Sequence, residues 1–279
     1  MKMHFVLTTL AICVWSCANG TKNAPERVVV NNIAGEPGMV STDPSPTPKS
    51  GPIARAAISD QRIDTYVDGK LESTSVYRDG RLVKDLIYNT DTKELTTEIE
   101  YFYKKNGELD HQKVVRGKYY DDSEEGVLER KQAEKDFKVQ YDLLKSKGIE
   151  FPLPDIASDE VRDLSNILSV ADNYNDFKRE IQTNGNQRVI KFVGFNKNIR
   201  FQPSVITLVA GNNPIQIKDF ELTLENDFPT KEILNTNDGE LTKTYSYKDG
   251  KLIRVIYQFT DLENRTNSLE KRFEYHELK

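Results

Sequence analysis

The strongest constraint on this chain is a short unit that recurs along it: a tyrosine, an Asp-Gly pair, a basic residue and a leucine. The unit occupies residues 66–71, 77–82 and 247–252. Asp-Gly between segments of alternating apolar residues is the strongest short-range signal for a two-residue β-hairpin turn, because Gly adopts positive φ without steric cost. Tyr66 and Tyr77 are eleven residues apart, about one strand plus one tight turn. The chain is therefore predicted to form antiparallel hairpins side by side.

Two weaker copies of the unit extend the pattern. Residues 103–109 carry Asn106-Gly107 as the turn, and residues 238–241 form a partial copy around Gly239. The pattern resembles the YD and MORN-like repeats of bacterial envelope and antitoxin-like proteins, over roughly a quarter of the chain. The resemblance implies an array of β-hairpins and brings no catalytic residue with it. An ordinary antiparallel meander with good turns has the same pattern, so that alternative stays open.

The N-terminus has the organisation of an export signal. A short basic start is followed by an apolar run at residues 5–14, which is too short to span a bilayer and typical of a signal-peptide core. The next residues, Val14-Trp15-Ser16-Cys17, resemble a lipobox. The resemblance implies that residues 1–16 are removed and that Cys17 receives the lipid. Cys13 is the competing candidate, but Ile12 is a poor residue to precede the cleavage site. A secretory signal with an incidental cysteine is the other alternative.

The cysteine count agrees with a lipid anchor. Cys13 and Cys17 are the only two cysteines, and both lie in this segment. The mature chain would keep only Cys17, as a thioether, so no disulfide, cysteine nucleophile or thiolate metal site is expected. Ala18 follows the lipidated position where an aspartate would signal retention at the inner membrane of enteric bacteria. The predicted location is therefore the cell envelope, at the outer membrane.

Residues 17–59 differ in composition from the rest of the chain. They hold six of its eleven prolines: Pro25, Pro37, Pro44, Pro46, Pro48 and Pro52. Proline-rich sequence with few aromatic residues buries too little apolar surface to offset the entropy of ordering, which predicts a disordered tether behind the lipid. Loss of Lys2 with the signal peptide changes the net charge from −5 to −6. This acidic balance disfavours nucleic acid as a partner.

Residues 60–279 are predicted to form one α+β domain, with β structure at 62–120, helices at 123–184 and β structure at 187–276. Ala133, Phe137, Tyr141 and Leu144 share one helix face. A second helix is predicted from Ser158, with apolar spacing that continues to Ile181. The fold class is an antiparallel β-sheet of hairpin repeats with an inserted helix pair packed on one face. The alternative is two β subdomains separated by the helices. A change of apolar phase predicts a β-bulge near residues 218–219.

Motifs of known chemistry are missing from the sequence. It holds no nucleophile elbow, phosphate loop, dinucleotide fingerprint or zinc-protease motif. His111 and His276 are predicted to be exposed residues at strand ends, not a catalytic or zinc pair. The acidic run at 235–240 fails the spacing of a calcium loop and is better explained as a hairpin turn. No enzyme activity, cofactor or metal is therefore expected.

Tyrosine is the one residue type that hints at function. The chain has 13 tyrosines, several of them in pairs. Tyrosine offers rigid amphipathic contact area for recognition, and it also stabilises cross-strand pairs, so binding and structural roles both stay open. The candidate binding residues are Tyr101, Tyr103, Tyr119, Tyr245 and Tyr247.

These observations lead to a hypothesis of function. The chain is predicted to be a non-enzymatic, lipid-anchored envelope protein that binds a protein or glycan partner through its β-repeat surface. The alternatives are a periplasmic immunity or antitoxin-like protein, on the repeat resemblance alone, and a hydrolase built from scattered carboxylates. The last would need a cleft with two carboxylates roughly 5–10 Å apart.

Overall fold

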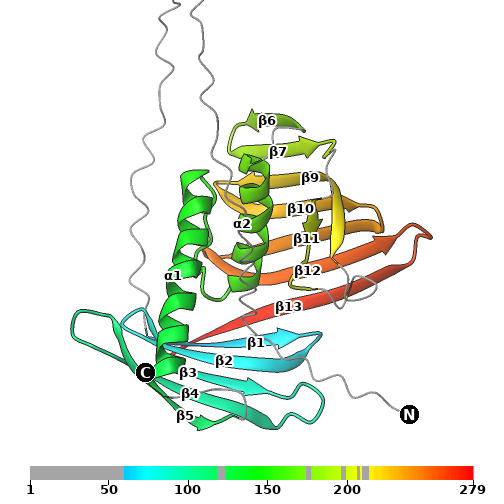
Figure 1. Cartoon of the computed structure of the whole chain (residues 1–279). Coiled ribbons are helices and arrows are strands. Elements are labelled where there is room, and N and C mark those ends of the chain that lie inside the picture. The colour runs from blue at the N-terminus through cyan, green and yellow to red at the C-terminus, as the bar shows by residue number, and fades with distance from the viewer. Residues whose placement is uncertain are drawn as a thin grey trace, which may run out of the picture. The chain divides into compact units, whose positions relative to one another are not determined.

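The computed structural model describes residues 60–117, 123–173, 177–195, 199–205, 208 and 214–278. The signal peptide, Cys17, the tether and Tyr119 lie outside these residues. The described part is one large antiparallel sheet with two helices beside it, which confirms the predicted α+β class (Figure 1).

The elements fall into two runs of strands around the helix pair. Before the helices come β1 (Gln61–Val67), β2 (Lys70–Arg78), β3 (Arg81–Tyr88), β4 (Leu95–Tyr103) and β5 (Leu109–Arg116). The helices are α1 (Glu124–Ser146) and α2 (Ser158–Asn173). After them come β6 (Lys178–Asn184), β7 (Gln187–Val193), β8 (Arg200–Phe201), β9 (Ile215–Glu225), β10 (Phe228–Thr236), β11 (Gly239–Lys248), β12 (Lys251–Asp261) and β13 (Thr266–Glu277).

The sheet joins two meanders at its centre. Its strand order is β5-β4-β3-β2-β1-β13-β12-β11-β10-β9-β7-β6, and β8 pairs with β9 off this path. β1 and β13, the first and last strands of the described chain, pair antiparallel from Gln61 opposite Glu277 to Val67 opposite Lys271. The helix pair connects β5 at one edge to β6 at the other. One continuous sheet therefore replaces the alternative of two β subdomains.

The sequence repeat corresponds to a bulged hairpin. The Asp-Gly turns have positive φ at both residues, as at Asp68 (47°) and Gly69 (74°), which is the geometry of a type I′ turn. In five hairpins of the described part, the tyrosine faces the leucine of the next strand and the register shifts beside that pair. The pairs are Tyr66–Leu71, Tyr77–Leu82, Tyr88–Leu95, Tyr103–Leu109 and Tyr247–Leu252. Each shift adds one residue to the second strand and increases the local twist.

Local signals determine where α1 begins and where the phase of β9 changes. The Ser123 side chain accepts a hydrogen bond from the Gly126 N–H and caps α1. In β9, Asp219 pairs with Asn235 while Ile217 pairs with Thr236, so Lys218 is the extra residue. This register shift confirms the predicted bulge near residues 218–219.

The prediction of helix over residues 178–184 was wrong. α2 ends at Asn173, and Lys178–Asn184 form strand β6, which pairs with β7. The apolar spacing that runs through Ile181 suggested helix, yet Ile181 is 54% exposed on this edge strand. Gly185 has φ +60° and turns the chain back, with Asn184 opposite Gln187. Turn chemistry therefore outweighed an apolar period that continued into the strand by coincidence.

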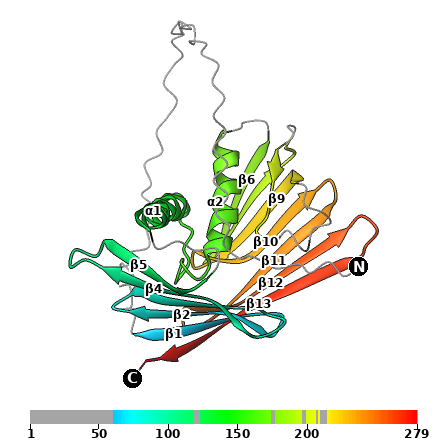
Figure 2. The same ribbon diagram turned by 60° about the horizontal axis from the view of Figure 1, so that its bottom comes forward.

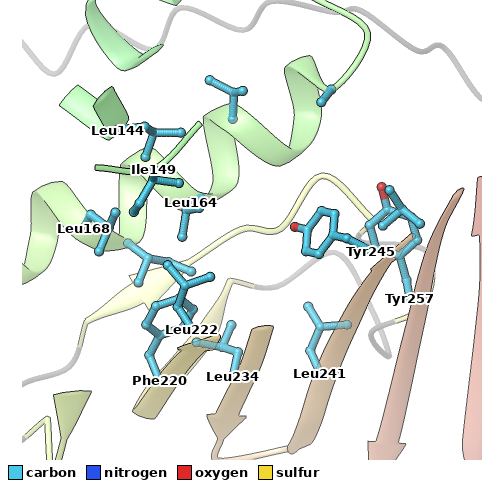
Figure 3. Packing of buried hydrophobic residues seen from close by; sticks show 14 of the residues in the cluster. Leu144, Ile149, Leu164, Leu168, Phe220, Leu222, Leu234, Leu241, Tyr245 and Tyr257 are labelled. Atoms are coloured by element: carbon cyan, nitrogen blue, oxygen red, sulfur yellow. The ribbon is translucent and has the colours of Figure 1, made fainter. Parts of the chain in front are cut away.

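The core lies between the helices and one face of the sheet. Both helices lie on the same side of the sheet (Figures 1 and 2). Buried residues of α2 pack on apolar residues of the strands, as Figure 3 shows for Leu164 and Leu168 of α2 with Phe220 and Leu222 of β9. A smaller cluster joins Val127 of α1 to Ile99, Tyr101 and Leu109 of β4 and β5. We refer to the sheet face that carries these residues as the inner face.

Candidate functional site

The predicted binding tyrosines inside the described part lie on the inner face. Tyr101 and Tyr245 are each only 5% exposed, and Tyr103 and Tyr247 are half-buried. The Tyr101 hydroxyl donates to Asp85 (3.3 Å) and the Tyr103 hydroxyl to the Leu82 carbonyl (2.8 Å). Tyr101 and Tyr245 are therefore too buried to contact a partner at the surface. The structure favours the structural role for these two tyrosines.

Tyr245 instead belongs to a buried cluster of charged and polar side chains between α2 and the sheet. We call it the acid–lysine cluster. α2 contributes three carboxylates and β10 a fourth, while β11 and β13 contribute one lysine each. Its members are Asp159, Glu160, Asp163, Glu232, Lys243, Tyr245, Tyr257 and Lys271. The hydroxyls of Tyr245 and Tyr257 are visible above the sheet in Figure 3.

Lys243 is the centre of one half of this cluster. Its Nζ lies 2.8 Å from Asp163 Oδ2 and 3.8 Å from Glu232 Oε2, and all three side chains are at most 3% exposed. The Tyr245 hydroxyl donates to Glu232. Ser204 donates to Asp163 Oδ1 through its hydroxyl (2.6 Å) and also through its backbone N–H (3.2 Å). Asp163 therefore connects α2 to a lysine of β11 and to the segment that follows β8.

Lys271 is the centre of the other half. Its Nζ lies 2.7 Å from Asp159 Oδ2 and 3.8 Å from Glu160 Oε1. The Tyr257 hydroxyl donates to Glu160, whose other oxygen has no hydrogen-bond partner in the described part of the chain. Arg162, on the rim, also pairs with Asp159 at 2.9 Å. The two halves repeat one pattern: a lysine, an aspartate in contact with it and a glutamate farther away.

Protons must make up the charge balance of this cluster. Burial raises the pKa of Glu232 against the opposing effects of Lys243 and Tyr245, and burial likewise raises the pKa of Glu160. Burial opposes ionisation of Asp159 too, but Lys271 outweighs it and lowers the pKa of Asp159. Burial thus favours the protonated form of both glutamates, while Asp159 and Asp163 lie against the ammonium groups.

A second polar group lies under the first turns of α1. The Arg130 guanidinium lies over the Tyr101 ring, 5.0 Å from its centroid, and its Nε lies 3.3 Å from Glu134. Asp85 accepts hydrogen bonds from Tyr101 and from Ser75 (2.7 Å), and burial raises its pKa against these contacts. Since α1 buries few apolar residues, this contact is a main attachment of the helix to β3 and β4.

The opposite, outer face of β4 and β5 carries an exposed aromatic pair. Phe102 is 40% exposed and stacks on His111, with 4.4 Å between ring centroids. Tyr101 and Tyr103, its neighbours along β4, face α1, so Phe102 points away from the helices. Charged residues of both signs surround the pair: Lys84 contacts Glu98 (2.8 Å) and Glu100 (3.0 Å). We call these residues, with Lys113, the outer patch.

One open cleft lies where β5 begins beside α1. It has a volume of about 330 Å³ and is lined by Glu108, Leu109, Lys131 and Glu134. The hydrolase alternative needs two carboxylates in such a place, one of them in an apolar setting that keeps it protonated. Glu108 is exposed, and Glu134 is the carboxylate that pairs with Arg130. The cleft therefore lacks the environment of a general acid.

The described residues carry neither a metal-binding cluster nor a membrane-spanning helix. No group of three or more His, Cys, Asp or Glu side chains in the described ranges is arranged to hold a metal ion. His111 stacks on Phe102, and His276 lies 3.2 Å from Asp64. Within those ranges no helix is long and apolar enough to cross a membrane.

Sequence reasoning missed the acid–lysine cluster, although a signal was present. Lys243 alternates in phase with Leu241 and Tyr245, which places it on the buried face of its strand. Lys271 stands in the same relation to Phe273, two residues on. A lysine on the apolar face of a strand requires a buried acidic partner, and the acidic residues of α2 are spaced to supply it.

Comparisons with known proteins assign no family and no function to this arrangement of residues. No family model, curated protein sequence or solved structure matches the chain.

Proposed function

We propose that this chain is a lipid-anchored protein of the bacterial cell envelope that binds a protein partner through the outer patch. The anchor is Cys17, on the strength of the lipobox-like residues before it. Residues 17–59 serve as the tether that holds the folded domain away from the bilayer. The binding surface is still the β-repeat sheet, but its central residues are Phe102 and His111 in place of the tyrosines.

The exposed Phe102–His111 pair is the observation that carries the binding proposal. An aromatic centre with charges of both signs around it has the composition of a non-obligate protein interface. Phe102 is an anchor of the size that dominates such interfaces. Among the described residues, the acid–lysine cluster offers no comparable binding surface, because its tyrosines are buried.

Lipidation is tested by metabolic labelling with a palmitate analogue. The wild-type chain should incorporate the label and fractionate with membranes. The Cys17→Ala chain should lose both properties, while Cys13→Ala should keep them. Label that survives in Cys17→Ala would show that the anchor is elsewhere or absent.

Partner binding is tested by placing a photo-crosslinking amino acid at position 102 in intact cells. A defined protein adduct is expected there and should weaken when Lys113→Glu reverses a neighbouring charge. The matched control is position 193, because Val193 is 42% exposed on the outer face of the other meander. Equal adducts at both positions would contradict a specific patch, and a glycan-sized adduct would replace the protein partner with a glycan.

A further inference from the structure

The Lys243 half of the acid–lysine cluster holds the parts of a condensation reaction. The amine nitrogen is Lys243 Nζ, which lies 2.8 Å from the Asp163 carboxylate and 3.8 Å from the Glu232 carboxylate. All three side chains are buried from water. We propose that Lys243 and Asp163 join through a side-chain amide bond, with Glu232 as the group that transfers protons.

Burial makes the reaction physically reasonable. In water an ammonium–carboxylate pair does not condense, because both ions are well solvated. Here both side chains are at most 3% exposed, so the pair is removed from the water that would otherwise solvate both ions. Fixed contact between reactants is worth effective molarities on the order of 10⁵–10⁸ M when the reacting atoms are aligned.

Ser204 supplies the electrostatic assistance that acyl chemistry needs. Attack on the carboxyl carbon puts negative charge on the oxygen that does not leave. Asp163 Oδ1 accepts from the Ser204 hydroxyl at 2.6 Å, and the Ser204 N–H lies 3.2 Å from Oδ1 and 3.1 Å from Oδ2. The hydroxyl, together with the shared N–H, stabilises negative charge on Oδ1, while Oδ2, the oxygen in contact with Lys243, is the leaving oxygen.

The bonds and protons of the step balance. The Lys243 ammonium gives one proton to Asp163 Oδ2, which produces an amine and a carboxylic acid. The nitrogen then bonds to the carboxyl carbon, and Glu232 takes the second proton from nitrogen while giving its own to Oδ2. The carbon–Oδ2 bond breaks and one water leaves. Glu232 ends protonated as it began, and no oxidant or other reagent is consumed.

The protonation states fit this sequence. Burial raises the pKa of Glu232, which keeps a transferable proton on that carboxyl. Burial disfavours the Lys243 ammonium, but Asp163 and Glu232 outweigh this and raise its pKa, so the ion pair is the resting state. Proton transfer inside the pair is therefore the first event.

The leaving water has a place beside the reacting groups. A cavity of about 10 Å³ is lined by Glu232 and Lys243, with Ile167, Phe201, Leu234 and Leu241 as its apolar walls. A cavity needs about 10–15 Å³ of this kind of volume to hold one water molecule, so this cavity is at the lower limit.

The second half of the cluster is a matched comparison within the same molecule. Lys271 contacts Asp159 at 2.7 Å and has Glu160 at 3.8 Å, the same arrangement of residue types. Asp159 is 22% exposed and also binds Arg162, so solvent and a second cation hold it as a carboxylate. We expect this pair to remain an ion pair.

The amide bond would give the folded domain a covalent cross-link that its cysteines cannot provide. It ties α2 to β11 across 80 residues, where an exported protein commonly has a disulfide. The only cysteines of this chain are Cys13 and Cys17, both ahead of the domain.

Intact-protein mass spectrometry of the purified full chain tests the proposal. The expected result is a mass one water below that of the mature chain with its lipid on Cys17, and a branched peptide that joins Asp163 to Lys243 after digestion. Lys243→Arg, Asp163→Ala and Glu232→Ala should each restore the full mass, whereas Lys271→Arg should keep the loss. A wild-type chain of full mass without the branched peptide would overturn the proposal, whether or not any variant folds.

Two other results are distinguishable. Succinimide formation at an Asp-Gly turn such as Asp79-Gly80 also loses one water, but it persists in Lys243→Arg and gives no branched peptide. A branched peptide that joins Asp159 to Lys271 would refute the assignment of the amide bond to the more deeply buried pair, Asp163 and Lys243. Either result counts against the amide bond at Lys243.

Discussion

At the scale of single residues, the interior of this protein is organised by two lysines. Lys243 and Lys271 face α2 from the inner face of the sheet, where burial is costly unless each ammonium has a partner. The acidic residues of α2 provide those partners. Because Asp159, Glu160 and Asp163 are spaced to meet both lysines, the cluster fixes the position of α2 along the sheet as well as its contact with it.

Loss of Lys271 should be strongly destabilising. Lys271→Met leaves Asp159 with only Arg162 on the rim and removes the lysine nearest to buried Glu160. Removal of one partner from a buried pair costs about 3–5 kcal/mol. Partial exposure of Asp159 favours the lower end of that range. Urea unfolding measures the loss. The control, Lys178→Met, breaks the solvent-exposed contact with Glu180 and should leave the midpoint unchanged. Equal effects of the two variants would contradict the role of burial.

Glu160 should make stability depend on pH. Burial raises the pKa of Glu160 in the folded state. The contribution of Glu160 to the free energy of unfolding is therefore fully present below the ordinary glutamate pKa, and it is lost as pH rises through the pKa of the folded state. The free energy of unfolding of the wild-type chain should therefore fall as pH rises above about 4.5. Glu160→Gln should flatten this decline. An unchanged pH profile in that variant would show that Glu160 does not carry the proton.

At the scale of elements, the unit of construction is the bulged hairpin. Its parts were predictable because they are local: the Asp-Gly turns and the phase change at Lys218 need only neighbouring residues. The helical interpretation of residues 178–184 failed at the same scale. Apolar spacing that runs on to Ile181 predicts helix, whereas the turn at 184–186 joins β6 and β7 in a hairpin. The β-bulge beside each tyrosine–leucine pair was not predicted. A sequence repeat gives the spacing of residues along the chain but not the register in which two strands pair.

Two turn glycines should differ sharply in their tolerance of a side chain. At Gly250 (φ +70°) a Cβ meets nothing within 4 Å, so Gly250→Ala should cost only the backbone strain, about 1–2 kcal/mol. At Gly239 (φ +151°) a Cβ would lie 2.2 Å from the Thr260 carbonyl oxygen, which forces β11 and β12 apart. Gly239→Ala should therefore be the more destabilising of the two in urea unfolding. The reverse order would contradict the described contact.

At the scale of the whole molecule, the decisive contact is the pairing of β1 with β13. It merges two meanders into one sheet and brings the ends of the domain together, where the Leu278 N–H donates to the Asp60 carbonyl (3.0 Å). Sequence patterns gave both strands but not their pairing, because alternation within a strand says nothing about a neighbour so far away in the chain. The acid–lysine cluster was missed for the same reason, since α2 and β13 meet only in the folded sheet.

Removal of β13 should therefore abolish the domain rather than shorten it. A chain that stops before Thr266 loses the strand between β1 and β12, and it also loses Lys271. We expect broad, non-cooperative unfolding and rapid proteolysis of both meanders. Circular dichroism melting curves and limited trypsin digestion measure these effects. A sharp transition in the truncated chain would show that one meander folds alone.

The central pairing also has a consequence in time. A chain is synthesised from its N-terminus, so β1 exists long before the strand that will lie beside it. Asp68 accepts a hydrogen bond from the N–H of Glu270, 202 positions later. Contacts this distant in sequence form slowly. Until they form, the unpaired edge of β1 can make non-native pairings with other strands. The strand β13 is thus the one that ends this exposure, and before it is synthesised the domain has no finished sheet in which β1 is protected.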